Sequence, residues 1–434
     1  MKKIFFKIHR TFKLIFTRIR YVIYYRNRYQ IDDNLIFLES FQGRNFSDNP
    51  RALFDYLKNN KEFNNYNFVI SFRKHTFIEK FCEYENYMLD ASTLNSSSFN
   101  FLKTIKEYQL NDRIKLIQYQ KRPYYRYMAQ AKYIISCSVF DQAFKIKEHQ
   151  FYLQTWHGTP LKKLGWDIDV KGDNNNRSVL RTKISYELDA RRYSLMCSPS
   201  KFYSKHISSA FALKKVKKEN VMKLTGYPRN DYLVNNNNSS YILSLKDKYN
   251  IPHDKKVILY APTWRENDYK VGEGYCFDLK LDLVKLRELF SKNCILILRI
   301  HYLIRQYLTI DEDDDFIYDL SKDVDIRDLY LMSDVMITDY SSTMFDYAIL
   351  NRPILLYMYD LETYQNLTRG FYFDIKKLPF NISQNMDELV NDLKDSLSLN
   401  IDYKAKYLKF NKMFNPLEDG NSAKRTIEEL FKLK

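Results

Sequence analysis

The chain alternates short apolar runs with polar or helix-forming segments along most of its length. Runs such as NLIFLES (34–40) and YNFVISF (66–72) are rich in aromatic and β-branched residues, as strands are. Strands that alternate with helices are typical of parallel α/β sheets. In the first half we expect strands at 34–40, 66–72, 115–120, 133–138 and 151–156, and strand-to-turn units at 194–200 and 221–231.

A second series of expected strands follows the polar stretch NNNNSS (235–240), which we interpret as a structureless linker. Because 434 residues exceed one ordinary core, the sequence predicts two Rossmann-like, doubly wound α/β domains, at 31–234 and 241–434, with the last helix able to pack back on the first domain. Ligands of such domains bind at the carboxyl ends of the strands, in the cleft. The second series comprises 255–264, 294–301, 315–320, 334–342 and 353–360.

Residues 1–30 form a separate basic segment, with nine Lys or Arg and no Asp or Glu. They hold more than half of the net charge of +16. No uncharged run reaches the ~18 residues that a membrane span needs, and no cleavable signal is recognisable. We expect an interfacial helix on an anionic membrane surface; a helix packed on its own domain and an RNA-binding arm are the alternatives. Its apolar residues recur at helical spacing: Ile4, Ile8, Phe12, Ile15, Ile19 and Val22.

Composition and missing motifs exclude several classes of protein. Hydrophobic residues make up 45% of the chain, so it is globular. The five cysteines form no CxxC pair, which favours reduced thiols in a cytosolic compartment. There is no P-loop, GxGxxG or GxSxG motif, and no metal-ligand spacing, so we expect no cofactor and no metal. The acidic run 311–315 could bind a divalent cation, but we interpret it as a solvated loop. DID (167–169) and DVD (323–325) resemble the metal-binding Asp-x-Asp of many sugar transferases, and we discount both because neither clearly ends a strand.

The stretch FYLQTWHGTPLKK (151–163) places His157 at the end of an expected strand. Gly158 allows a tight turn, Thr159 can cap a helix, and Pro160 suits the first helical position. The amino end of such a helix attracts anions, and Lys162 and Lys163 add charge. His157 is therefore a candidate general base beside an anion pocket. An isolated histidine that merely caps a strand is the plainer reading.

Further polar residues lie at the ends of other expected strands. Ser341 and Ser342 can cap a helix and donate to a phosphate, and Asp346 lies one turn further on the same face. Each motif alone could be an ordinary cap or a solvated strand end. Together they predict one ligand cleft. The others are Arg299 and His301 in LRIH, Pro262 and Thr263 in YAPTWR, and Arg229 in GYPRND.

These motifs together resemble the CDP-glycerol glycerophosphotransferase family, the bacterial teichoic-acid primases and polymerases. The resemblance covers about residues 35–375; WHGTPLKK and the DYSS…FDY…RP block are its specific parts, and ESFQG, GYPRND, YAPTWRE and LRIH support it. It implies a GT-B fold and peripheral attachment to the inner membrane face. It also implies a metal-independent reaction, in which an acceptor hydroxyl attacks the polyol-bearing phosphorus of a CDP-polyol and CMP leaves.

The resemblance implies that His157 and His301 are catalytic. It assigns the remaining pocket to Gly158, Thr159, Pro160, Leu161, Arg229, Pro262, Thr263, Arg299, Ser341, Ser342 and Asp346. Implied partners are a CDP-glycerol or CDP-ribitol donor and a lipid-linked or polysaccharide acceptor in teichoic acid or capsule synthesis. No nucleic-acid partner is expected.

Two departures from the family pattern affect the donor. Tyr302 stands where proline is usual after LRIH, and LPFN (378–381) replaces the usual Pro-Gly. CDP-ribitol thus stays an alternative to CDP-glycerol, and a sugar-nucleotide glycosyltransferase of the same fold is a second alternative. A non-catalytic basic protein is a third. The length suits a primase or a decorating transferase better than a long-chain polymerase.

Overall fold

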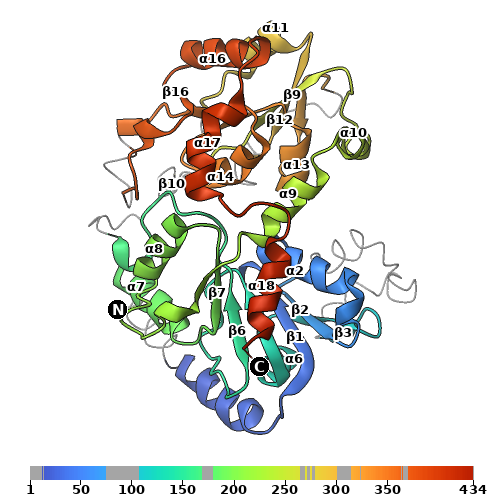
Figure 1. Ribbon diagram of the computed structural model, residues 1–434, viewed down its shortest axis with the longest axis vertical. Coiled ribbons are helices and arrows are strands. Elements are labelled where there is room, and N and C mark those ends of the chain that lie inside the picture. The colour runs from blue at the N-terminus through green and yellow to red at the C-terminus, as the bar shows by residue number, and fades with distance from the viewer. Residues whose placement is uncertain are drawn as a thin grey trace.

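The computed structural model describes residues 12, 14–74, 107–168, 179–263, 269–270, 274–275, 279–300, 314–322, 324–362, 364 and 370–433. Two α/β domains follow one another along the long axis of the molecule (Figure 1). Each domain is built on its own sheet, with apolar clusters on both faces of that sheet. The prediction of two parallel α/β domains is confirmed.

The sheet of the N-terminal domain has the strand order β3-β4-β2-β1-β5-β6-β7-β8. Every neighbouring pair is parallel except β3 and β4. All the strands expected in the first half are present, most of them one or two residues shorter than expected. The strands are β1 (Asp32–Glu39), β2 (Asn67–Phe72), β3 (Glu107–Gln109), β4 (Ile114–Gln118), β5 (Ala131–Ser136), β6 (Phe151–Gln154), β7 (Leu195–Ser198) and β8 (Met222–Leu224).

The sheet of the C-terminal domain has the order β13-β12-β9-β14-β15-β16 and is parallel throughout. Its central strands are fully buried, as expected for a sheet covered on both faces. The strands are β9 (Lys256–Tyr260), β12 (Cys294–Leu298), β13 (Ile317–Asp319), β14 (Val335–Thr338), β15 (Ile354–Tyr357) and β16 (Asn381–Ser383); β10 (Tyr269–Lys270) and β11 (Gly274–Tyr275) form a separate antiparallel pair.

Helices cover both sheets, and the last one crosses back to the N-terminal domain (Figure 1). In this helix, α18 (Ser422–Phe431), Phe431 stacks on Tyr133 of β5 with ring centroids 4.6 Å apart. The other helices are α2 (Asp48–Asn59), α6 (Arg122–Gln130), α7 (Val179–Ala190), α8 (Lys201–Ala210), α9 (Asp231–Asn236), α10 (Ser239–Lys248), α11 (Leu283–Phe290), α13 (Ile326–Met332), α14 (Thr343–Tyr347), α16 (Met386–Ser398) and α17 (Tyr403–Phe414).

The stretch 235–240 is not a structureless linker, so that prediction is wrong. Helix α9 ends at Asn236 and α10 begins at Ser239, which leaves only two residues between them. Asn238 caps α10, because its side chain accepts a hydrogen bond from the backbone N–H of Tyr241 at 3.0 Å. A run of asparagines here supplies a helix cap rather than a flexible connection.

The helix at the start of the described chain presents apolar side chains to solvent. Residues 14–21 are helical and continue into the π-helical turn η1 (Val22–Arg26). Tyr21 and Tyr25 are buried against the N-terminal domain, near Tyr125 of α6. On the opposite side Phe12, Ile15, Phe16 and Ile19, spaced three or four residues apart, are each at least half exposed. Of the expected stripe, Phe12, Ile15 and Ile19 are exposed and Val22 is half-buried against the domain, while Ile4 and Ile8 lie outside the described residues.

Among the described residues, no helix combines the length and the hydropathy needed to cross a membrane.

Candidate active site in the cleft

The carboxyl ends of the two parallel sheets meet at Gly158 and Ser342. Gly158 follows β6 of the N-terminal domain, and Ser342 follows β14 of the C-terminal domain. A Cβ atom on Gly158 would lie 2.9 Å from Ser342 Oγ, and the φ angle of Gly158 is +148°. Glycine suits this position because a side chain would strain the backbone and push against Ser342 of the other domain. Of the predicted site residues, His157, Gly158, Arg229, Ser342 and Asp346 lie together around this contact.

His157 lies in this cleft with one ring nitrogen fixed. Its Nδ1 is 2.6 Å from the carbonyl oxygen of Cys137, at the end of β5. Because a carbonyl can only accept, Nδ1 carries the proton and Nε2 keeps its lone pair. Burial lowers the pKa of His157 below its ordinary value; the Cys137 carbonyl and Asp48 oppose this shift. The imidazole is therefore neutral at pH 7, as a general base must be.

The backbone around His157 is held by side chains from other elements. The carbonyl of Trp156 accepts a hydrogen bond from Asn49 Nδ2 at 3.2 Å, and that of His157 accepts one from Arg229 Nη1 at 3.1 Å. The N–H of Gly158 donates to the Tyr227 hydroxyl at 2.7 Å. Trp156 adopts a left-handed φ of +52°, which is unusual for a residue with a large side chain. These contacts hold the sharp turn that presents the histidine.

Arg229 is the centre of a buried ionic cluster that joins the domains. Its Nη1 lies 2.5 Å from Asp48 Oδ2 of α2, and its Nη2 lies 2.6 Å from Asp346 Oδ2 of α14. The three side chains are between 8% and 12% exposed. Burial opposes the charge on Arg229, but the two carboxylates raise its pKa well above the ordinary value. Arg229 and Asp346, both expected to touch substrate, contact each other in this structure.

The helix expected to begin at Thr159 is absent, so that prediction is wrong. Residues 159–164 instead form an extended, irregular segment, called the strap below, that runs toward the C-terminal domain. Lys162 forms a β-bridge with Phe371, the N–H of Lys163 donates to Gly370 O at 2.9 Å, and that of Tyr372 donates to Leu161 O at 3.0 Å. Leu161 is buried in the core of the C-terminal domain. Thr159 and Pro160 are buried beside it, and the strap joins the domains.

The C-terminal domain contributes residues held by its own backbone. The Ser341 hydroxyl accepts from the N–H of Thr343 at 3.3 Å in the turn before α14, and Ser342, at the N-cap position, makes no side-chain cap. The backbone N–H of Thr263, just beyond β9, donates to Asp339 at 2.8 Å, with Pro262 beside it. Arg299 Nη1 donates to the carbonyls of Leu320 and Ser321 at 3.0 and 2.6 Å. His301 lies outside the described residues.

Some residues of this site could not be singled out from the sequence. No role was predicted for Asp48 and Asn49, and Tyr227 was visible only as a neighbour of Arg229 in GYPRND. Asp339 belongs to the TDYSST motif but was not assigned a role. Their position directly before or after an expected strand or helix was the available signal.

The acidic and cysteine side chains of the described residues have structural surroundings. No group of three or more His, Cys, Asp or Glu side chains that could hold a metal ion occurs within the described part of the chain. Cys137, Cys197 and Cys294 are buried and free, as expected of reduced thiols. Asp325 caps α13 and pairs with Arg327, and Asp314 pairs with Arg287, so these acidic residues have structural partners.

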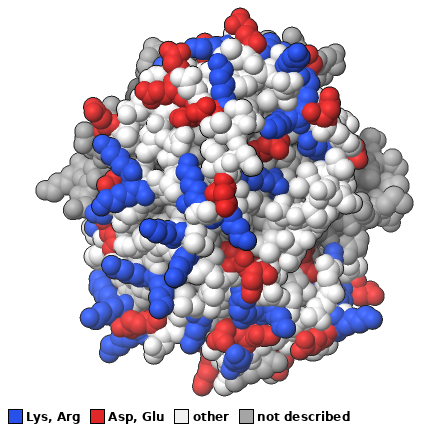
Figure 2. All heavy atoms as spheres, turned by 45° about the horizontal axis from the view of Figure 1, so that its top comes forward, with Lys and Arg blue, Asp and Glu red and all other residues white. Residues whose placement is uncertain are grey.

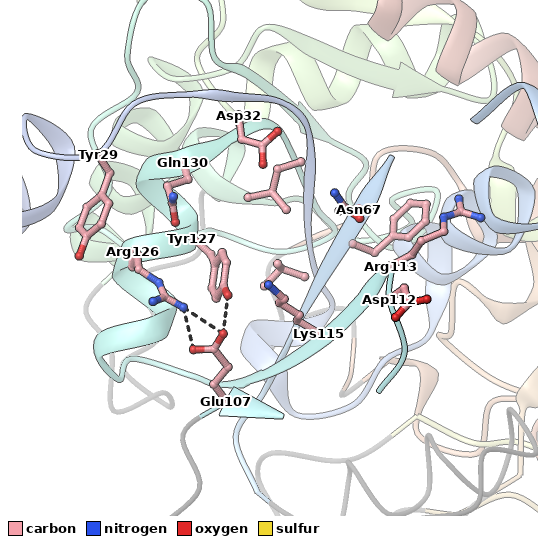
Figure 3. Close-up of a pocket in the computed structure, with 13 residues that line it drawn as sticks. Tyr29, Asp32, Asn67, Glu107, Asp112, Arg113, Lys115, Arg126, Tyr127 and Gln130 are labelled. Atoms are coloured by element: carbon pink, nitrogen blue, oxygen red, sulfur yellow. Dashed lines mark hydrogen bonds and ion pairs between the residues drawn. The ribbon is translucent and has the colours of Figure 1, made fainter. Parts of the chain in front are cut away.

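A polar pocket of about 470 Å³ lies at the opposite end of the N-terminal sheet, where β1, β2 and β4 begin (Figure 3). Glu107 is held there by Arg126 at 2.7 Å and by Tyr127, and Lys115 faces the same space. The pocket lies at the amino ends of the strands, whereas His157 lies at their carboxyl ends. It is therefore separate from the cleft.

Comparison with known proteins identifies the family. The sequence profile of the CDP-glycerol:poly(glycerophosphate) glycerophosphotransferase family matches residues 20–432. The chain is 35% identical over 400 residues to the teichoic acid poly(glycerol phosphate) polymerase of Bacillus spizizenii (strain ATCC 23059 / NRRL B-14472 / W23), covering 92% of each chain. It is 36% identical over 403 residues to the teichoic acid glycerol-phosphate transferase of Staphylococcus aureus (strain NCTC 8325 / PS 47), covering 92% of this chain and 93% of the relative.

A comparison with solved structures indicates the same family. The wall teichoic acid polymerase TagF superposes with a TM-score of 0.80 at 29% identity, over 100% of this chain and 98% of that one. By contrast, the poly(ribitol-phosphate) polymerase of the same Bacillus strain is 28% identical over 77% of this chain. The expected GT-B-like fold is confirmed by the TagF match. The chain belongs to the CDP-glycerol:poly(glycerophosphate) glycerophosphotransferase family and is an enzyme that transfers glycerol phosphate from CDP-glycerol.

Proposed function

We propose that His157 is the general base of this transfer in teichoic acid synthesis. Nε2 takes the proton of an acceptor hydroxyl as its oxygen attacks the phosphorus that bears glycerol. A new P–O bond forms, the bond between this phosphorus and the bridging oxygen of the pyrophosphate breaks, and CMP leaves. The observation that carries this proposal is the Nδ1 contact with Cys137, which leaves Nε2 as the basic nitrogen. Proton transfer by a positioned side chain contributes about 10²–10⁴-fold to rate.

The donor would lie along the carboxyl edge of the C-terminal sheet. Thr263, Arg299 and Ser341 follow β9, β12 and β14, which are neighbours in that sheet. Carboxyl ends of parallel strands are where such folds bind nucleotides. We assign the pyrophosphate to this edge, with Gly158, Thr159 and Ser342 at its boundary with His157. Pro262 and Leu161 shape the walls, and His301 is proposed to act on the same phosphates.

A basic flank beside the cleft supports an anionic acceptor. Figure 2 shows Lys and Arg side chains gathered on the left of the molecule, the side on which α8 lies in Figure 1. Poly(glycerol phosphate) and lipid-linked phosphates carry repeated negative charge, so a basic flank would raise their local concentration. The exposed lysines of α8 and the loop after it are Lys201, Lys205, Lys214, Lys215 and Lys217.

The N-terminal helix is proposed to hold the enzyme on the cytoplasmic face of the cell membrane. Its exposed stripe of Phe12, Ile15, Phe16 and Ile19 is apolar, and Arg18 and Arg20 beside it are exposed and basic. Apolar burial in the headgroup region combined with attraction to anionic lipid is how interfacial helices bind. Tyr21 and Tyr25 fix the helix to the domain, so the stripe faces away from it.

The experiment is CMP release by the purified enzyme with a membrane acceptor and, in parallel, CDP-glycerol, CDP-ribitol and a sugar nucleotide. We expect CMP from CDP-glycerol, and little from CDP-ribitol. If CMP is released from CDP-ribitol and not from CDP-glycerol, the donor is CDP-ribitol. Release of a nucleoside diphosphate from the sugar nucleotide alone, with acceptor present, would overturn the proposal in favour of glycosyl transfer.

A further inference from the structure

We infer that Asp48 and Asn49, the first residues of α2, are positioning residues that hold His157 in its basic geometry and make that geometry depend on contact between the two domains. This inference rests on the proposed role of His157 as general base. It concerns two side chains that lie more than 100 residues from the histidine in sequence.

Asn49 makes two hydrogen bonds to the segments that form the site. Its Nδ2 donates to the carbonyl of Trp156 at 3.2 Å, and its Oδ1 accepts from the backbone N–H of Arg229 at 3.0 Å. The side chain is fully buried, so water cannot take the place of either hydrogen bond if it is lost. One amide therefore sets the spacing between the histidine turn and the turn that carries Arg229.

Asp48 acts through Arg229. Its carboxylate lies 2.5 Å from Arg229 Nη1, the same nitrogen that donates to the carbonyl of His157 at 3.1 Å. Asp48 itself has a left-handed φ of +64°, which non-glycine residues seldom adopt, and its Oδ1 accepts from the N–H of Asn49 at 2.7 Å. The start of α2 is thus bent to bring the carboxylate to the guanidinium.

The other face of the guanidinium extends the arrangement into the C-terminal domain. Arg229 Nη2 is 2.6 Å from Asp346 Oδ2 in α14. If α14 moved away, Arg229 would lose one of its two counterions while still buried, and its grip on the His157 carbonyl would change. The contact between the domains and the support of the His157 carbonyl therefore share one guanidinium group.

Two charged groups surround the imidazole, Asp48 from α2 and Arg229 from η6 (Pro228–Asn230). The nearby thiol of Cys137, the residue directly after β5, stays neutral, because burial raises its pKa well above the ordinary value. Asp48 favours the imidazolium that forms when Nε2 takes the proton, and Arg229 disfavours it. Removing the Asp48 charge should therefore lower the pKa of His157 further and make it a weaker base.

The test measures kcat, KM for CDP-glycerol and the pH profile of kcat for Asp48→Asn, Asn49→Ala and the matched control Asp55→Asn. Asp55 is on the same helix and pairs with Arg51 at 2.8 Å, away from the histidine turn. We expect kcat to fall about 10–100-fold in Asp48→Asn and Asn49→Ala, since small misplacement of a catalytic group has effects of this size. KM should stay within about twofold, and Asp55→Asn should match the wild type.

The pH profile separates positioning from a merely structural role. In Asp48→Asn the acidic limb of kcat should move to lower pH, because the carboxylate that favours the imidazolium is gone. Asp48→Glu keeps the charge and should lose kcat without moving the limb. If Asp48→Asn does not fold, Asp48→Glu takes its place, and an unchanged kcat in that variant overturns the inference.

His157→Ala distinguishes the two proposals. If the His157→Ala enzyme is active, His157 is not the general base. An inactive His157→Ala enzyme, with wild-type kcat and an unmoved acidic limb in Asp48→Asn, leaves the base role standing and overturns the role of Asp48. A fall in kcat with the expected shift supports both.

Discussion

The two sheet edges that form the cleft are held in different ways. On the N-terminal side, the turn at His157 is fixed by Asn49, Tyr227 and Arg229, and Arg229 also reaches Asp346 in the other domain. On the C-terminal side, Arg299 and Thr263 are fixed by groups of their own domain. The turn that carries the proposed base is thus tied to the other domain through the Arg229–Asp346 ion pair, whereas these bonds of Arg299 and Thr263 lie within the C-terminal domain.

This difference suggests a division of labour. Arg299 and Thr263 are held by bonds within the C-terminal domain, so we expect both to keep their positions when the contact between the domains is lost. If His157 is the base, its dependence on contacts from both domains should limit transfer to water when the domains are apart. The following changes test this contrast.

The largest effect should come from Arg229→Ala, compared with Arg299→Ala. Loss of Arg229 leaves Asp48 and Asp346 buried without a cation, which should destabilise the protein by about 3–5 kcal/mol. Loss of Arg299 leaves two carbonyls on one partly buried turn and should cost about 1–2 kcal/mol. Urea unfolding of both variants measures their free energies of unfolding. Equal decreases in the two variants would mean that the two sheet edges are not held differently.

Gly158→Ala should come next. The new Cβ would lie 2.9 Å from Ser342 Oγ at a backbone φ of +148°, so we expect about 1–3 kcal/mol of destabilisation and a lower kcat. Adding Ser342→Gly removes the opposing side chain and should restore part of the stability but not the backbone strain. Thermal melts and CMP release check both variants. Additive losses in the double variant would mean that the domains do not touch here.

A moderate effect is expected in the pH dependence. Burial lowers the pKa of His157, so the acidic limb of kcat should lie below the ordinary value of about 6.5. Activity is kept as pH falls toward 6.5 and is lost only below it, when the imidazole gains a proton. A pH profile with saturating CDP-glycerol measures this. A limb at or above 6.5 would contradict a buried neutral base.

The smallest effect on chemistry should follow Phe16→Glu with Ile19→Glu. Both side chains are exposed and far from the cleft, so CMP release with a soluble acceptor should be unchanged. Co-sedimentation with phosphatidylglycerol vesicles should fall at least tenfold. Leu243→Glu, an exposed apolar position on α10, is the control. If the wild type, the Phe16→Glu/Ile19→Glu variant and the Leu243→Glu variant bind vesicles equally, this helix does not hold the enzyme on the membrane.

The longer strands could be predicted because each is a short apolar run, as at β9 and β12. The short strands β3, β10, β11 and β16 were not predicted, because two or three residues carry no such run. The position of His157 at a strand end was equally visible. The helix at Thr159 was wrongly predicted, because local cap signals were outweighed by pairing of the strap with residues 370–372. The contacts of Arg229 with Asp48 and Asp346 join residues more than 100 positions apart, which no local pattern records.

The central claim is that His157 of this cleft is the base of glycerol-phosphate transfer. The most direct measurement is CMP release from CDP-glycerol by His157→Ala, with the wild type beside it and folding confirmed by thermal melts. We predict a loss of kcat of about 10²–10⁴-fold with KM for CDP-glycerol nearly unchanged. A folded His157→Ala enzyme with kcat within a factor of about three of the wild type would contradict the account.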